Sequence, residues 1–297
     1  MAEITASMVK ELREKTNAGM MDCKKALAAT NGDFDAAVNW LREKGLAAVA
    51  KKAGRVAAEG LVGIVHEGEV AAMVDVNCET DFVAQNPDFQ AFVKDMAAAV
   101  VRTKPADIEA LRAQTKDKLA EKIGKIGENM TLRRFARAEG VLGSYLHMGG
   151  SIGVIVELDV KDKKDSETVK QLARDVAMQV AASSPMWLRR EDADQKTLEN
   201  EKNIAREKAK ADGKPEKIID KIAEGVVNKF LQENCLLEQA FVKDDRTTVQ
   251  KHVDKQAKEL GITIAVRAMH RFKVGEGIEK KADDFAAEVA KMAGKAS

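Results

Sequence analysis

Residues 61–78, LVGIVHEGEVAAMVDVNC, contain two runs with strand-like composition around the turn Glu67-Gly68. Two such runs joined by a short Gly-containing turn predict a β-hairpin. The next segment, NPDFQAFVKDMAAAVVR, offers Asn86 as a helix N-cap and Pro87 at the first helical position, where the missing N–H of proline costs nothing. These residues therefore predict a unit in which a hairpin is followed by a helix.

The same order of elements recurs later in the chain. VLGSYLHMGGSIGVIVELDV (141–160) has strand content on both sides of the turn HMGG, and the helical pattern of 166–184 ends before Pro185. The helical motifs KDMAAAV and RDVAMQV begin at Lys94 and Arg174, 80 positions apart. We interpret this as an internal duplication, with a chance match of two short motifs as the alternative. Hairpins followed by helices predict an α+β fold with two related subdomains.

Residues 1–54 are predicted to form a small bundle of three helices and a linker. The first helix follows a candidate N-cap at Thr5 or Ser7, and the second follows a break at Ala18-Gly19. The third begins after Asn31-Gly32 and is expected to end at Gly45, before an Ala-rich, basic linker helix. A unit of this size can bury only a small core.

A second helical segment is predicted to interrupt the repeated core. Residues 188–233 form two helical patterns joined at Gly213-Lys214-Pro215, which indicates an antiparallel, coiled-coil-like hairpin that projects into solvent. The expected packing stripe of its second helix is Ile218, Ile222, Val226 and Phe230. The predicted organisation is a helical module (1–54), two core subdomains (55–140 and 141–274, the latter with the insertion 188–233) and a C-terminal helical module (275–297) that contains DDFAAEVAKMA.

Composition excludes several broad classes of protein. The 297 residues exceed one typical domain, and 45% hydrophobic with 33% charged residues is typical of a globular protein. Lys and Arg number 49 against 48 Asp and Glu, a net charge of +1 that argues against a dedicated nucleic-acid binder. Three scattered cysteines favour a reducing compartment, and neither a signal peptide nor a membrane span is expected. We therefore expect a cytoplasmic protein.

No catalytic constellation is apparent in the sequence. The chain lacks a phosphate-binding loop motif, and its four histidines show no metal-ligand spacing, so neither a cofactor nor a bound metal is expected. Cys78 and Asp81 could be imagined in a nucleophilic site, but a cysteine that closes a strand is expected to be a buried structural thiol. We expect a protein that is not an enzyme.

Four ordered segments carry a resemblance to a known family. They are NAGMMDCKKAL (17–27), AKKAGRVAAEGLV (50–62), VNCETDFVAQN (76–86) and RFKVGEGIEK (271–280), with further similarity in KIGENM, VLGSYLHMGG and QVAASSP. Together they resemble bacterial elongation factor Ts over the whole chain. The resemblance implies a ubiquitin-associated-like (UBA-like) three-helix bundle, a core of two related subdomains, a coiled-coil insertion and a C-terminal helical module.

The resemblance also implies a function. Members of this family are guanine-nucleotide exchange factors that act on the GTPase elongation factor Tu. The matching loop Thr80, Asp81, Phe82 and Val83 is the segment that enters the partner and disturbs its Mg²⁺ site, so that GDP is released. No bond is made or broken, which agrees with the missing catalytic residues. A dimer of the heterodimer is a further implied assembly, and neither direct nucleic-acid binding nor membrane binding is implied.

Further partner contacts are implied at seven positions outside this loop. They are Arg13, Met20, Met21 and Lys24 in the helical module, Ile126 and Gly127 near the loop, and His147 in the second hairpin. For Met20 and Met21 the alternative is packing in the bundle core, and for His147 it is an ordinary turn residue. Three departures from the family pattern are Asn17, Ser151 and Ala240, which stand where glycine, a basic residue and proline are usual.

Three other functions compete with nucleotide exchange. A scaffold without exchange activity would not depend on the ring of Phe82. A nucleic-acid-associated protein would bind RNA with a steep dependence on salt. An unrecognised enzyme would have an activity that is lost with one side chain such as Cys78.

Overall fold

The computed structural model describes residues 4–16 and 18–279. The helices α1 to α10 span Ala6–Thr16, Met20–Ala29, Phe34–Lys52, Asp81–Ala84, Pro87–Thr103, Ile108–Ile126, Glu167–Ser183, Gln195–Ala211, Glu216–Asn234 and Val249–Leu260. The strands β1 to β8 span Glu59–Glu67, Val70–Cys78, Met130–Glu139, Val141–His147, Ile152–Val160, Ala240–Phe241, Asp244–Thr248 and Ile264–Lys273. Three short 3-10 helices, η1 to η3, span Met148–Gly150, Arg190–Asp192 and Leu236–Glu238. Asn17 and the predicted C-terminal helix DDFAAEVAKMA lie outside the described residues.

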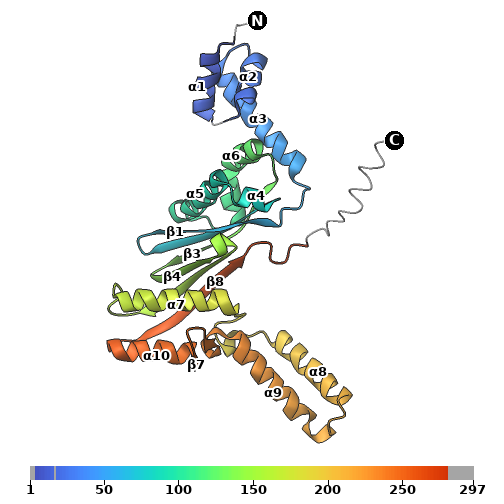
Figure 1. The fold of residues 1–297 in the computed structure, drawn as a ribbon, viewed down its shortest axis with the longest axis vertical. Coiled ribbons are helices and arrows are strands. Elements are labelled where there is room, and N and C mark those ends of the chain that lie inside the picture. Colours follow the sequence, from blue (N-terminus) through green and yellow to red (C-terminus); the bar gives the residue numbers. More distant parts are fainter. Residues whose placement is uncertain (1–3, 17, 280–297) are drawn as a thin grey trace.

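The predicted α+β class is confirmed. Two antiparallel three-stranded sheets, in the orders β1-β2-β3 and β4-β5-β8, account for the long strands, and β6 and β7 form a small third sheet. The two larger sheets pack face to face between two layers of helices, with α5 and α6 on one side and α7 and α10 on the other (Figure 1). Each sheet therefore buries both of its faces.

The two large sheets repeat the same construction. In each, a hairpin leads to a 17-residue helix, and α5 begins at residue 87 where α7 begins at 167. Gly63 of β1 and Gly143 of β4 lie directly beneath Val93 of α5 and Ala173 of α7. Because a Cβ on Gly143 would lie 2.1 Å from the carbonyl oxygen of Ala173, glycine is what allows this helix to approach its sheet so closely.

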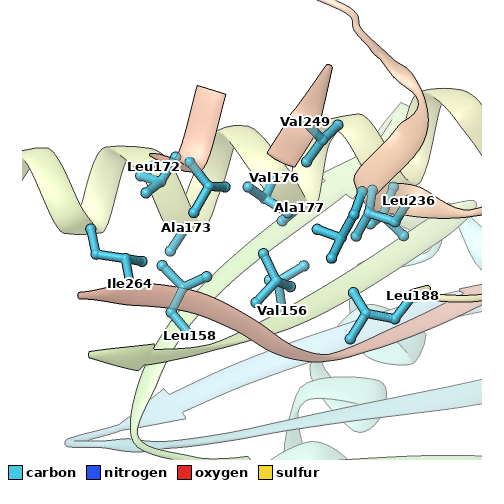
Figure 2. Close-up of a cluster of buried hydrophobic side chains, with 14 of the residues drawn as sticks. Val156, Leu158, Leu172, Ala173, Val176, Ala177, Leu188, Leu236, Val249 and Ile264 are labelled. Carbon is cyan, nitrogen blue, oxygen red and sulfur yellow. The ribbon is translucent and has the colours of Figure 1, made fainter. Parts of the chain in front are cut away.

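Three apolar clusters hold these layers together. One joins α5 and α6 to the first sheet, and another joins α7, α10 and η3 to the second sheet through side chains such as Val156, Val176 and Val249 (Figure 2). The third lies between the sheets and includes Met73 and Ile155. At about 25 cal/mol per Å² of buried apolar surface, these clusters are the main source of stability in the core.

The N-terminal helices α1, α2 and α3 enclose a separate small apolar core. The predicted end of the third helix at Gly45 is wrong, because α3 runs on to Lys52 through the expected linker. A Cβ at Gly45 would lie 3.4 Å from the carbonyl oxygen of Ala120 in α6. Gly45 therefore lies in the contact between α3 and α6 and does not end the helix.

Helices α8 and α9 form a hairpin that extends away from the sheets (Figure 1). The ion pairs Arg206–Asp220 and Lys202–Glu224 link the two antiparallel helices, at 2.9 and 3.9 Å. The predicted packing stripe is wrong by one position. The buried residues of α9 are Ile219, Ala223 and Leu231, whereas Ile218 and Val226 of the predicted stripe are exposed; Ile222 and Phe230 are partly buried.

Candidate protein-binding surface

The segment between β2 and α5 contains the short helix α4, where the sequence predicted only a loop. Thr80 is its N-cap, and the threonine hydroxyl accepts a hydrogen bond from the backbone N–H of Val83 at 3.3 Å. A capped turn gives the neighbouring side chains fixed directions. Val83 points into the core, while Asp81 and Phe82 are exposed.

Phe82 is the most exposed of the large apolar side chains in the described residues, with 82% of its surface accessible. An exposed aromatic ring on an ordered turn is a frequent anchor of protein–protein contacts. Asp81 lies at the first helical position of α4, where a negative charge is stabilised by the helix N-terminus. The predicted loop therefore presents an apolar ring beside a carboxylate.

Cys78 lies beneath this turn and is fully buried, which confirms the prediction of a structural thiol. Its Sγ–H donates to the carbonyl oxygen of Thr80 at 3.1 Å. Burial, reinforced by the negative charge of Glu128, raises the pKa of Cys78 to about 12. The thiol is therefore un-ionised at neutral pH and is not a nucleophile there.

The turn is fastened to the segment that follows α6. The Glu128 carboxylate accepts hydrogen bonds from the backbone N–H groups of Glu79 and Thr80, both at 3.1 Å, and from the Thr80 hydroxyl at 2.6 Å. In return, the Glu79 carboxylate accepts from the backbone N–H of Asn129 at 2.5 Å. These contacts place Ile126 and Gly127, at the end of α6, beside the turn that carries Phe82.

Sequence reasoning missed the residues that make this connection. Glu79 and Glu128 are separated by almost 50 positions, and nothing in their local sequences predicts that they meet. Arg55 joins the same network, since its guanidinium pairs with Glu79 at 3.4 Å and its carbonyl oxygen accepts from the Asn129 side chain at 2.7 Å. The quoted motif KIGENM contains Glu128 and Asn129, and that similarity was the only signal that could have indicated them.

His147 lies near the same end of the molecule, at the exposed tip of the β4–β5 hairpin. Gly150 in this tip packs on Leu61 and Val62 of β1, the strand whose first residue, Glu59, pairs with Cys78. The tip and the Phe82 turn therefore both flank the beginning of β1.

Two of the departures from the family pattern can be located. Ser151, one of these departures, closes the tip, because its hydroxyl donates to the carbonyl oxygen of His147 at 3.2 Å. The second, Ala240, is exposed at the start of β6, and its carbonyl oxygen accepts from the Gln179 side chain at 3.2 Å.

The four predicted contacts in the helical module are all exposed. Arg13 is exposed on α1, and Met20, Met21 and Lys24 are exposed on α2. Met20 and Met21 are 57% and 64% accessible, so neither packs in the bundle core. The three-helix bundle that carries these residues contacts the core through the packing of α3 on α6 (Figure 1).

A cavity of about 450 Å³ lies between the bundle and α6, and its walls include Asp22, Val38, Leu41 and Asp117. None of the predicted site residues lines it. In the described part of the chain, no three His, Cys, Asp or Glu side chains are grouped so as to hold a metal ion. No helix among the described residues is long and apolar enough to cross a membrane. Most of the predicted residues thus lie on the surface and outside this cavity, whereas Val83 is buried in the core.

Comparisons with known proteins bear on what binds to these surfaces. A sequence model of the family described as "Elongation factor TS" matches residues 79–276. The chain is 49% identical to elongation factor Ts of Clostridium kluyveri, over 97% of this chain and 98% of that protein. It is 50% identical to the protein of the same name from Syntrophotalea carbinolica, over 98% and 99% of the two chains. By these matches, the chain belongs to the elongation factor Ts family of translation elongation factors.

Proposed function

We propose that this chain is a guanine-nucleotide exchange factor that binds elongation factor Tu in its GDP form and promotes GDP release. The observation that carries the proposal is the display of Phe82. An aromatic side chain that is 82% accessible stands on a turn fixed by a capping threonine and a carboxylate from another segment. Exposed aromatic rings on ordered turns are frequent anchors of protein–protein contacts, and this display therefore supports binding to a partner.

The proposed mechanism is mechanical and electrostatic. Phe82 inserts between elements of the GTPase and is buried there, while Asp81 brings its negative charge toward the site that holds the partner's Mg²⁺. Since Mg²⁺ shares its ligands with the nucleotide phosphates, a disturbed metal site holds GDP more weakly. By thermodynamic linkage, GDP then weakens the binding of the factor by the same ratio, so the ternary complex is short-lived.

The remaining predicted residues extend this contact. We assign Arg13, Met20, Met21 and Lys24 to a second contact with the nucleotide-binding domain of the partner. Their exposure on α1 and α2 supports this assignment. His147 is assigned to another domain of the partner, and Ile126 and Gly127 to the surface around the Phe82 turn. No covalent step is involved, so the chain needs neither a cofactor nor a metal of its own and is not an enzyme in the chemical sense.

The proposal includes a division of labour along the chain. Residues 1–54 act as a UBA-like recognition module, and the two related subdomains, 55–140 and 141–274, carry the exchange loop and the His147 tip. The α8–α9 hairpin is a coiled-coil insertion, and we assign the segment 275–297, most of which lies outside the described residues, to a further contact with the GTPase. We place the protein in the cytoplasm, where translation elongation takes place.

The competing functions predict different observations. A scaffold would bind elongation factor Tu without changing the rate of GDP release. An RNA-associated protein would bind tRNA with an affinity that falls steeply with salt. An enzyme would require a reactive group, and the raised pKa of Cys78 argues against the only thiol near the loop.

The decisive experiment follows the release of a fluorescent GDP analogue from purified elongation factor Tu in the presence of excess unlabelled GDP. We expect the release rate to rise with the concentration of this chain and to saturate. Release by the GTPase alone is the baseline. A rate that stays at this baseline while the two proteins co-elute would refute exchange and favour the scaffold.

A further inference from the structure

The contacts of Glu128 differ from those of the other surface carboxylates. One side chain, half-buried after the end of α6, collects three hydrogen bonds from the segment before Phe82. Two come from consecutive backbone N–H groups and one from a hydroxyl. A carboxylate that accepts several hydrogen bonds holds its donors strongly, because hydrogen bonds to an ionised acceptor are about twice as strong as neutral ones.

The direction of the hydroxyl bond has a structural consequence. The Thr80 hydroxyl donates its proton to Glu128 at 2.6 Å, which leaves its oxygen lone pairs free for the backbone N–H of Val83 at 3.3 Å. Glu128 therefore orients the hydroxyl that caps α4. If the carboxylate is removed, the hydroxyl can rotate and the cap is no longer fixed.

The hydrogen bonds between these two segments run in both directions. Glu79 accepts from the backbone N–H of Asn129, while Glu128 accepts from the backbone N–H of Glu79. We name the pair Glu79 and Glu128, with their backbone partners, the carboxylate latch. The latch joins two segments at the base of the Phe82 turn, so it fixes the turn without occupying the exposed surface itself.

We propose that Glu128 is a positioning residue for nucleotide exchange, which acts by holding the Phe82 turn in the form that enters the partner. This inference rests on the proposed function. Phe82 is 82% accessible in the described part of the chain, so packing does little to hold its side chain in place. Its direction is therefore set by the backbone of α4, and through Thr80 the latch sets that backbone. A partner pays less entropy when it binds a turn that is already ordered.

The test uses the full chain with Glu128→Gln. The substitution keeps the size of the side chain, but its amide nitrogen cannot accept a hydrogen bond, so either the two backbone bonds or the hydroxyl bond is lost. Glu121→Gln, an exposed position on α6, is the matched control. We expect Glu128→Gln to lower the accelerated rate of GDP release by about tenfold, because the ordered form of the turn becomes a minor population.

Two measurements separate positioning from a general structural role. The first is amide hydrogen exchange of the free chain, where peptides covering residues 78–86 should lose protection in Glu128→Gln and keep it in Glu121→Gln. The second is a double-mutant cycle with Phe82→Ala. If Glu128 acts through the ring, its substitution lowers the release rate in the wild-type background and has no further effect in the Phe82→Ala background.

The outcomes are distinguishable. Equal fold-losses in both backgrounds, or a Glu128→Gln chain as active as the wild type, would overturn the positioning role. Unchanged amide protection would overturn the latch itself. If the wild-type chain fails to accelerate GDP release, the proposed function is refuted and the role of Glu128 in exchange falls with it. Hydrogen exchange would in that case still show whether the latch orders the turn, because that measurement needs no partner.

Discussion

Replacing Phe82 with alanine separates the stability of the fold from its function. The ring is 82% accessible in the free chain, so its removal takes away almost no buried contact. Substitutions at exposed positions usually change the free energy of unfolding by no more than about 0.5 kcal/mol. We therefore expect Phe82→Ala to fold as well as the wild type.

The effect on the complex should be much larger. Full burial of a phenylalanine side chain contributes about 1.5–3 kcal/mol relative to leaving it in water. Since 82% of the ring surface is still available for burial, the partner can gain about 2 kcal/mol from it, which corresponds to roughly a thirtyfold change in binding or rate. The ratio of maximal release rate to half-saturating concentration should fall by about this factor.

The assay is GDP release from elongation factor Tu, measured over a range of factor concentrations, together with urea unfolding of each variant. Phe89→Ala is the opposite control, because Phe89 is fully buried and its truncation should cost about 3–5 kcal/mol of stability. Val242→Ala, at an exposed apolar position on the β6–β7 turn, should leave both stability and release unchanged.

Two results would contradict this reasoning. If Phe82→Ala unfolds at a much lower urea concentration, the ring packs against the free fold and contributes to its stability. If Phe82→Ala accelerates release as well as the wild type, the ring is not the anchor, and the exchange mechanism must rest on other residues.

Three further predictions concern the framework of the site. In urea unfolding, Gly143→Ala should destabilise the fold by about 1–3 kcal/mol or more, because its Cβ would lie 2.1 Å from a carbonyl oxygen of α7. Gly54→Ala is the control and should be neutral, because a Cβ at Gly54 would meet no atom within 4 Å. Burial raises the pKa of Cys78 from 9.0 to about 12, so the stability that depends on the neutral thiol is complete below pH 9 and is lost as the pH rises toward 12. Between these two pH values, the free energy of unfolding should fall less steeply with pH for Cys78→Ala than for the wild type. Glu276 joins the two sheets through ion pairs with Arg271 and Arg134, at 3.0 and 3.3 Å. Glu276→Ala should lower the free energy of unfolding by about 1 kcal/mol, and added salt should reduce this effect. An unchanged free energy of unfolding would show that these partly exposed ion pairs contribute nothing to stability.

Local sequence patterns were sufficient to predict elements that are marked by a capping residue or a turn motif. The Asn86 cap is seen in its bond to the backbone N–H of Asp88, and the hairpin around Gly68 forms with a two-residue turn between β1 and β2. These features depend on residues a few positions apart. The caps and turns are therefore favoured by neighbouring residues alone, without any long-range contact.

Other elements could not be recognised locally. Helix α6, helix α10 and strand β3 were not predicted, although β3 completes the first sheet beside β2. The β3 sequence MTLRRFARAE carries four charged residues. Arg133 and Arg134 pair with Asp75 of the neighbouring strand β2, at 3.9 and 2.9 Å, and Arg137 pairs with Glu139 of β3 itself. A strand of this kind looks too polar from its sequence alone, and only its pairing explains it.

The residues Thr80 to Val83 could be identified from the sequence, because a resemblance to a family marked them. The conformation and the exposure of these residues could not be predicted from the sequence. Whether the segment is a loose loop or a capped turn depends on Glu128, which reaches it from almost 50 positions away. The sequence by itself determined the hairpins, the Asn86 cap and the α+β class, which follow from neighbouring residues. Only the tertiary structure decided that α3 continues through Gly45, which face of α9 is buried and that Phe82 points outward, since each depends on packing or hydrogen bonds between distant segments.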